Sequence, residues 1–137
     1  HYRIEATDID TKILEVARKG SYSADLLKNV SSVRREKYFR VENDTFLFDE
    51  KLKRRVSFKS HDLLKDPYIT GLDLIVCRNV QIYFTRDAQD RVVKQFSESL
   101  NPGGYLFIGS SETIFNWREL KLEKRFLSFY RKSEVRS

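Results

Sequence analysis

The sequence contains a single cysteine, Cys77, and no methionine among its 137 residues. One cysteine excludes an internal disulfide and gives no sign of an oxidising compartment, so we expect a cytoplasmic protein. No window approaches the roughly 18 consecutive apolar residues of a membrane span, and the amino terminus lacks the apolar core of a signal peptide. Because the chain begins at His1 without any methionine, we expect it to be a fragment of a longer protein.

Glycine is scarce as well, and its placement excludes a common motif. A doubly wound nucleotide-binding sheet normally has a glycine-rich turn after its first strand, which lets the backbone approach the ligand closely. None of the glycines lies in such a turn before the first expected helix. They are Gly20, Gly71, Gly103, Gly104 and Gly109.

The composition is that of one folded domain or part of one. With 40% hydrophobic and 13% aromatic residues, the chain can form a core and is not compositionally disordered. Its 26 basic and 20 acidic side chains give a net charge of +6, which favours acidic partners without naming one. Solvated faces around a core are the favoured explanation of the basic residues, and a surface for an acidic protein or a nucleic acid is the alternative.

The stretch from Leu72 to Phe84 is the most informative part of the chain. Residues 72–77 form a largely apolar run, which is typical of a strand covered on both faces in the middle of a parallel sheet. Arg78 and Asn79 follow at its carboxyl end, where open α/β sheets bind their ligands. The pattern therefore predicts a small-molecule site at this edge of the sheet.

The remaining pattern predicts an α/β fold with a largely parallel sheet. A first strand over residues 2–7 leads to a helix that starts at Thr11, with Asp10 as its N-cap and Gly20 as its stop signal. Asp8 is then free for another role. Short helices are expected within 21–39, where they bury Leu26, Leu27, Val30 and Val33, and an inserted hairpin is expected over 38–55. Further strands are expected over 56–61 and 105–109, and a helix over 87–100 that ends at the segment 101–104. A terminal antiparallel pair is expected within 117–131.

Polar residues follow three of the predicted strands, and they form the candidate ligand site. Asp8 suits the paired hydroxyls of a ribose, because one carboxylate can accept both. Asp62 suits the exocyclic amine of an adenine, with Leu63 packed on the ring. Asn79 and Val80 are placed to hold the same ligand from the central strand. Each polar residue alone is also explained as a cap or a turn residue, so the coincidence at three strand ends carries the hypothesis.

Four segments resemble, in order and spacing, the chemotaxis receptor methyltransferases of the CheR type. The run Arg-Asn-Val-x-Ile-Tyr-Phe is the most specific part of this resemblance, which covers nearly the whole chain from Ala6 to about Lys132. The segments are Ala6–Asp10, Asp62–Leu64, Cys77–Phe84 and Leu100–Glu112.

The resemblance implies a Rossmann-like class I methyltransferase sheet and an S-adenosylmethionine-dependent enzyme. Such enzymes methylate glutamate side chains on the cytoplasmic helices of chemoreceptors, release S-adenosylhomocysteine and use no metal. Carried over by position, the resemblance implies roles for seven residues. Asp8 would hold the ribose, Asp62 and Leu63 the adenine, Asn79 and Val80 the cofactor from the central strand, and Arg78 and Tyr83 would form the active-site pair.

The same resemblance implies that residues 1–137 are a partial catalytic domain. The amino-terminal helical domain and the glycine-containing first motif of the family would precede His1. In the family's strand order, the absent first strand lies between the strand that ends at Asp8 and the one that ends at Asn79, so the sheet should be split in two. Residues 38–55 resemble the family's inserted β-subdomain. A non-catalytic basic module of the same fold, docking an acidic receptor or an RNA, is the alternative interpretation.

Overall fold

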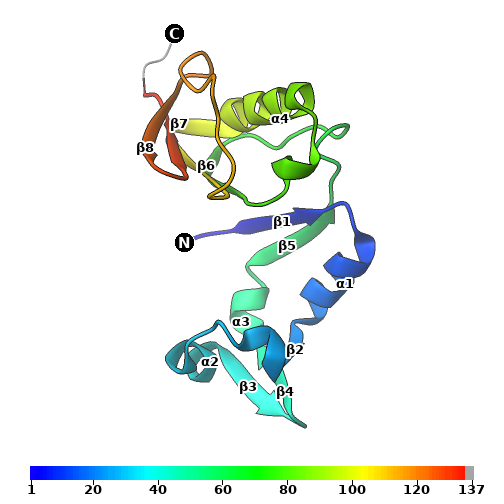
Figure 1. The fold of residues 1–137 in the computed structure, drawn as a ribbon. Helices are drawn as coiled ribbons and strands as arrows, with labels where there is room; N and C mark the ends of the chain where they lie inside the picture. The colour runs from blue at the N-terminus through cyan, green and yellow to red at the C-terminus, as the bar shows by residue number, and fades with distance from the viewer. Residues whose placement is uncertain (135–137) are drawn as a thin grey trace. The chain divides into compact units, whose positions relative to one another are not determined.

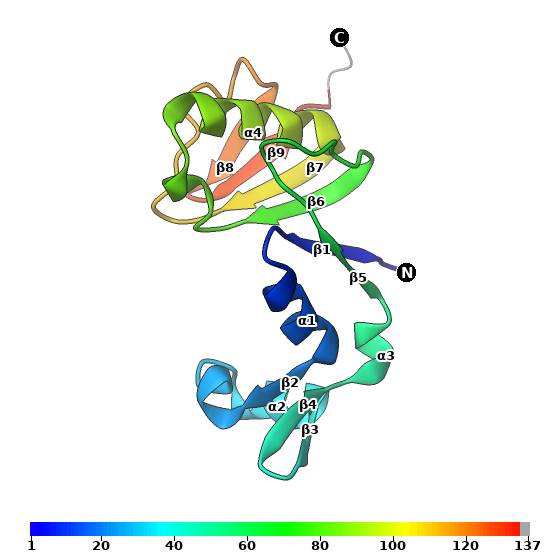
Figure 2. The same cartoon turned by 90° about the vertical axis from the view of Figure 1, so that its right-hand side faces the viewer.

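The computed structural model describes residues 1–134, which form two compact units. Residues 1–62 form the first unit, and the described residues from Leu63 onward form the second. Figures 1 and 2 show the elements of both units in two views. Each unit has its own sheets, and each is described by itself below.

The first unit contains a parallel pair of strands with one helix packed against it. Strands β1 (Ile4–Asp8) and β5 (Val56–Ser60) pair in parallel, so that Asp8 lies opposite Ser60. Helix α1 (Thr11–Lys19) follows β1, and the side chain of its N-cap Asp10 accepts hydrogen bonds from two backbone N–H groups of the first turn. The helix ends at Gly20, whose φ of 63° is left-handed. The predicted cap and stop signal are both confirmed.

The first unit also contains a three-stranded antiparallel sheet with the order β2-β4-β3. The predicted hairpin is confirmed as β3 (Phe39–Glu42) and β4 (Thr45–Phe48). Its turn residues Asn43 and Asp44 have positive φ, as a tight hairpin requires. Phe39 contacts the rings of Tyr22, Phe46 and Phe48, and this aromatic cluster takes the place of a larger core.

The prediction for the segment that precedes this hairpin was partly wrong. It begins with a strand, β2 (Ser21–Ser23), which pairs with β4, and continues as the 3-10 helix η1 (Ala24–Leu27) and helix α2 (Ser32–Tyr38). Of the four apolar residues expected to face a core, Leu27 is buried, whereas Leu26 and Val33 are 70% and 71% exposed. Strand β2 pairs with β4 through the backbone, and the helical spacing of the apolar residues did not reveal this pairing. A short helix, α3 (Glu50–Lys53), leads into β5.

The second unit is a four-stranded sheet with the order β6-β7-β9-β8. Strands β6 (Leu72–Cys77) and β7 (Leu100–Ile108) are parallel, and β8 (Leu122–Phe126) and β9 (Phe129–Lys132) form the terminal antiparallel pair. Helix α4 (Arg86–Ser99) covers one face of this sheet (Figure 2). The parallel pairs β1–β5 and β6–β7, together with the terminal antiparallel pair β8–β9, confirm the predicted α/β class.

The core of the second unit lies between α4 and the sheet. The predicted stripe of α4 is buried in full: Ala88, Val92, Val93, Phe96 and Leu100. Opposite this stripe, the side chains of Leu106, Ile108 and Tyr130 are completely inaccessible to solvent. When the apolar residues of a helix are spaced three and four apart, they lie on one face of the helix. In this unit that face packs against the side chains of alternate strand residues, which point to the same side of the sheet.

Strand β6 differs from its prediction as a strand buried on both faces. Among the described residues it pairs with β7 alone, and Leu74 and Val76 are 54% and 60% exposed. Only alternate residues, Ile75 and Cys77, face α4 and are buried. Strands β1 and β6 belong to different sheets, as expected if no strand of this chain joins them.

The segment Asn101–Gly104 was predicted to separate α4 from the next strand, and this was also wrong. β7 begins at Leu100, directly after the helix, and includes these four residues. An irregularity in the register accommodates them, because Leu72 pairs with Leu100 whereas Leu74 pairs with Tyr105. A proline and two glycines are therefore tolerated in a strand at a bulge.

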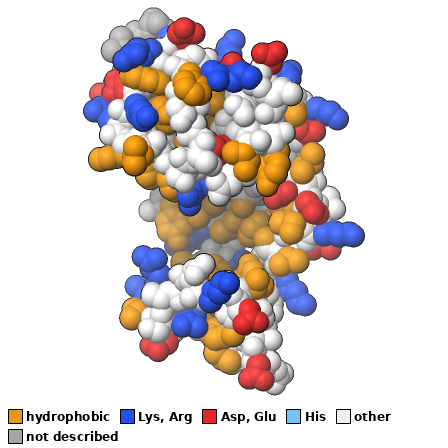
Figure 3. Space-filling view, viewed as in Figure 1, with side chains coloured by type: hydrophobic (Ala, Val, Ile, Leu, Met, Phe, Trp, Pro, Cys, Tyr) orange, Lys and Arg blue, Asp and Glu red, His pale blue; other side chains and the backbone are white. Residues whose placement is uncertain are grey.

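Charged side chains are distributed over both units. Figure 3 shows Lys and Arg side chains scattered among Asp and Glu over the face in view, rather than gathered in one block. In the part of the chain that the structure describes, no helix is both long and apolar enough to cross a membrane.

Candidate cofactor and active site

One segment of the second unit contains four of the predicted site residues. Arg78, Asn79, Val80 and Tyr83 lie between the end of β6 and the start of α4, with Tyr83 in the short 3-10 helix η2 (Gln81–Tyr83). Asn79 has a φ of 59°, which is unusual for a residue other than glycine. The side chain of Tyr83 is 82% exposed. The chain therefore turns sharply at Asn79 and presents its polar and aromatic side chains at the sheet edge.

A side chain without a predicted role joins the ends of β6 and β7. Glu112 lies four residues after β7 and is only 7% exposed. Its carboxylate accepts backbone hydrogen bonds from Asn79, Gln81 and Gly109. Its signal in the sequence is an acidic residue shortly after a predicted strand that ends in glycine, within the segment Leu100–Glu112 of the resemblance.

Asp8 and Asp62 belong to the first unit, at the carboxyl ends of β1 and β5. The backbone N–H of His61 donates to the carbonyl of Asp8, which continues the parallel pairing past both strands. Asp8 was expected to be free for another role, and one of its two carboxylate oxygens is used locally. Its Oδ1 accepts a hydrogen bond of 2.9 Å from the backbone N–H of Asp10. Within residues 1–134 its second oxygen has no hydrogen-bond partner, so one acceptor is available to a ligand hydroxyl.

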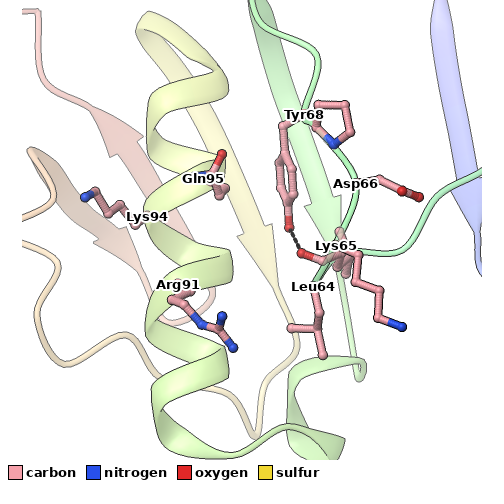
Figure 4. A pocket seen from close by; sticks show the side chains of 9 residues that line it. Leu64, Lys65, Asp66, Tyr68, Arg91, Lys94 and Gln95 are labelled. Atoms are coloured by element: carbon pink, nitrogen blue, oxygen red, sulfur yellow. Dashed lines mark hydrogen bonds between the residues drawn. The ribbon is translucent and has the colours of Figure 1, made fainter.

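Leu63 lies in the second unit, where it packs against the core and borders a groove. The groove has a volume of about 570 Å³ and lies between α4 and residues 63–68 (Figure 4). The hydroxyl of Tyr68 donates a hydrogen bond of 2.8 Å to the carbonyl of Leu63, which fixes that part of the wall. Three cationic side chains, from Lys65, Arg91 and Lys94, line the groove together with the carboxylate of Asp66. Its charged side chains are therefore mostly basic.

Cys77 is buried at the end of β6 and is not suited to act as a nucleophile. Burial, and then the negative charge of Glu112, raises the pKa of its thiol to about 11. A thiol with such a pKa is almost entirely protonated at neutral pH, whereas the thiolate is the reactive form.

The chemical nature of these side chains fits a nucleoside-type cofactor. A carboxylate with one available oxygen suits ribose hydroxyls, and apolar Leu63 and Val80 suit a purine ring. No group of three or more His, Cys, Asp and Glu side chains in residues 1–134 is arranged to hold a metal ion. Asp8 and Asp62 come from the first unit and the other predicted residues from the second.

An α/β fold with these polar groups after parallel strands defines a nucleoside-cofactor-binding domain. A family model described as "CheR methyltransferase, SAM binding domain" matches residues 1–128. The chain belongs to this methyltransferase family, and its cofactor is S-adenosylmethionine. The predicted resemblance to the CheR type is confirmed.

The chain is similar over most of its length to several chemotaxis proteins. It is 44% identical to the "Chemotaxis protein methyltransferase" of Listeria monocytogenes over 85% of this chain and 44% of that protein. It is 39% identical to "Chemotaxis protein methyltransferase 1" of Vibrio cholerae over 81% of this chain and 42% of that protein. The chain thus spans less than half the length of these relatives. A solved structure titled "The structure of PKMT2 from Rickettsia typhi in complex with AdoHcy" is 17% identical with a TM-score of 0.49, over 77% of this chain and 16% of that one.

Proposed function

We propose that the full-length protein transfers a methyl group from S-adenosylmethionine to glutamate side chains of chemoreceptors, forming glutamate methyl esters. The observation that carries this proposal is the segment from Arg78 to Tyr83, which has the family's specific motif and is held at the carboxyl end of β6. The names of the relatives support a chemotaxis substrate. A cytoplasmic location and the cytoplasmic helices of chemoreceptors as partners belong to the same proposal.

We assign the cofactor contacts to five residues. Asp8 would accept from the ribose through its available oxygen, and Asp62 would accept from the adenine amine. Leu63 would pack on the adenine ring, while Asn79 and Val80 would hold the cofactor from the end of β6. The hydrogen bond between Tyr68 and the carbonyl of Leu63 supports the role of Leu63, because it keeps that wall in place.

The chemistry requires few catalytic side chains. When bound, S-adenosylmethionine supplies a methyl group on a sulfonium; the new bond joins this carbon to a substrate oxygen, and the carbon–sulfur bond breaks to leave S-adenosylhomocysteine. A glutamate carboxylate is already ionised at neutral pH, so no general base is needed. Arg78 would orient this carboxylate through its guanidinium, and Tyr83 would shape the path of the methyl group or donate a hydrogen bond.

The net charge of +6 supports an acidic partner. Receptor helices of the kind that this family modifies are rich in glutamate, and complementary charge raises the rate of encounter. The basic side chains are spread over the face in view in Figure 3, so attraction on this face would not act through a single patch.

The proposal is tested by methyl transfer to receptor cytoplasmic fragments with a radiolabelled methyl donor. Label that alkali releases as methanol identifies an ester. We expect Arg78→Ala to lower kcat about tenfold or more and Tyr83→Phe to lower it severalfold, with cofactor affinity within about threefold, since both act mainly in the transition state. Equal losses of cofactor binding and turnover would place both residues in the cofactor pocket instead.

The control is Arg125→Ala. Arg125 is an exposed arginine of the same unit that pairs with Glu123 on β8, at 2.7 Å. Its loss changes the net charge as Arg78→Ala does, yet we expect turnover close to wild type. A comparable loss in Arg125→Ala would show that net charge, and not the position of Arg78, controls the reaction.

A second candidate function is a non-catalytic binding module that docks an acidic receptor or an RNA. The groove between α4 and residues 63–68 favours it, because three of its lining side chains are cationic. This candidate predicts a full-length protein that binds a receptor fragment or RNA without measurable affinity for S-adenosylmethionine. Calorimetric titration of the cofactor separates the two candidates.

A further inference from the structure

The carboxylate of Glu112 is buried and is held by backbone N–H groups from two different segments. Its Oε1 accepts from Asn79 at 2.5 Å and from Gly109 at 3.1 Å. Its Oε2 accepts from Gln81 at 3.2 Å. A buried carboxylate is costly unless hydrogen bonds replace its water, and three donors do so here. Two of them, from Asn79 and Gln81, belong to the segment that follows β6.

These contacts fix the backbone of residues 78–83, called the cofactor segment below, at the point where this segment turns. Asn79 has a φ of 59°, and its N–H points to Glu112. Farther along, the side-chain amide of Gln89 donates to the carbonyls of Gln81 and Phe84 at 2.8 and 3.2 Å. The segment is therefore held through its N–H groups by Glu112 and through its carbonyls by Gln89. Both anchors act on backbone atoms, so they set the direction in which the intervening side chains point.

The end of β7 leaves just enough room for this arrangement. A Cβ atom at Gly109 would lie 2.5 Å from Glu112 Oε1 and 2.6 Å from Asn79 Oδ1, closer than such atoms approach. The φ of Gly109 is not in the left-handed region, so the backbone itself does not require glycine. The glycine is required by the carboxylate and the amide packed against it.

We propose that Glu112 is a positioning residue for cofactor binding. By accepting the N–H groups of Asn79 and Gln81, it holds the turn from which Asn79 and Val80 reach the cofactor. Glu112 itself touches neither the cofactor nor the substrate in this scheme. The inference rests on the proposed function, because it assigns Asn79 and Val80 to S-adenosylmethionine.

The test is the affinity of the full-length protein for S-adenosylmethionine in the variant Glu112→Gln. Glutamine has the same shape, and its carbonyl oxygen can still accept from Asn79 and Gly109. Its NH₂ group, however, cannot accept from the N–H of Gln81. We expect the cofactor Kd to rise about tenfold in calorimetric titration. The KM for cofactor should rise similarly, with kcat at saturation nearly unchanged.

A matched control separates positioning from stability. Ser97 is buried in the same unit, where its hydroxyl donates to the carbonyl of Leu120 at 2.6 Å and accepts from Lys132 at 2.8 Å. Ser97→Ala removes buried hydrogen bonds that do not involve the cofactor segment. We expect it to lower the midpoint of denaturation while leaving the cofactor Kd at its wild-type value.

The variant Gly109→Ala tests the positioning role of Glu112 independently. Its added methyl group would displace the carboxylate of Glu112 and the side chain of Asn79, so the cofactor Kd should again rise about tenfold. A wild-type Kd in both Glu112→Gln and Gly109→Ala would overturn the positioning role, as would an equal loss in Ser97→Ala. A wild-type protein that does not bind S-adenosylmethionine would instead overturn the proposed function, and this inference with it.

Discussion

The guanidinium of Arg78 lies over the ring of Phe107, with its Cζ 4.9 Å from the ring centroid. Phe107 in turn stacks on Phe129, with centroids 4.3 Å apart and planes inclined by 6°. A cation over an aromatic face is attracted by the ring's negative face, by about 0.5–1 kcal/mol at exposed sites. Strands β7 and β9 therefore hold the side chain that we assign to substrate orientation.

We expect Phe107→Leu to lower kcat about two- to fivefold, since it removes an attraction of that size from Arg78. Cofactor affinity should stay within about twofold, because the ring of Phe107 contacts Arg78 and Phe129, neither of which is assigned to the cofactor. Phe107→Tyr keeps the ring and should retain nearly full turnover. Steady-state kinetics on a receptor fragment measures all three proteins. Equal turnover in the leucine and tyrosine variants would remove the ring from the mechanism.

Asp8→Ala should weaken S-adenosylmethionine binding by about 1–3 kcal/mol, the range for removing one partner of a buried hydrogen bond. The control is Asp10→Ala, which removes the N-cap of α1 and should cost about 1 kcal/mol of stability. Because Asp10 has no proposed contact with the cofactor, its variant should bind normally. Calorimetry on the full-length protein decides between them. An unchanged Kd in Asp8→Ala would remove Asp8 from the ribose site.

The sequence predicted elements best where a local signal coincided with a buried face. Helix α1 was bounded by Asp10 and Gly20, and the stripe of α4 met a sheet that could bury it. Strand β2 was missed because a three-residue strand has too few residues for a period-2 pattern to appear. The bulge at the start of β7 was missed because proline and glycine normally indicate a turn.

The residue types of the candidate site could be predicted from the sequence. The hydrogen bonds that hold these residues in place could not. The polar residues after each strand were visible as breaks in apolar runs. The contact between Glu112 and Asn79 spans 33 residues and involves backbone N–H groups, so no local pattern encodes it. Likewise, the hydrogen bond from the N–H of Asp10 to Asp8 follows from the turn geometry and not from the residue types.

Cys77 provides a prediction about pH. Its thiol pKa is raised from the ordinary 9.0 to about 11, chiefly by burial. The folded state therefore favours the protonated thiol, and this contribution is fully present below pH 9. It should decline as the pH rises from about 9 to about 11, by up to about 3 kcal/mol.

Denaturant titrations of the wild type and of Cys77→Ala across this pH range check the prediction. The difference in unfolding free energy between the two proteins should shrink as the pH rises. Alkylation offers a second measurement, since Cys77 is the single thiol of the sequence given. The thiol of Cys77 should react slowly with an alkylating reagent at pH 8 in native buffer and rapidly in urea. Fast native alkylation at pH 8 would contradict both the burial and the raised pKa.

The exposed edge and face of β6 lead to a prediction about residues 1–137 as an isolated polypeptide. Among the described residues β6 pairs only with β7, and Leu74 and Val76 are more than half exposed. We propose that a strand outside residues 1–137 covers this edge in the full-length protein. Without that strand, an unpaired apolar edge should pair with another copy of the chain, since such edges promote association.

We therefore expect the isolated polypeptide to self-associate and Val76→Lys to reduce this association, because a charge on the exposed face disfavours pairing between copies. Val33→Lys is the matched control. Val33 is 71% exposed on α2 of the first unit, whereas β6 belongs to the second, so its replacement adds the same charge without changing the β6 face. Size-exclusion chromatography with light scattering reports the mass of each species. A wild-type polypeptide that elutes as a monomer, or equal effects of the two lysines, would show that β6 is not the surface that needs a partner.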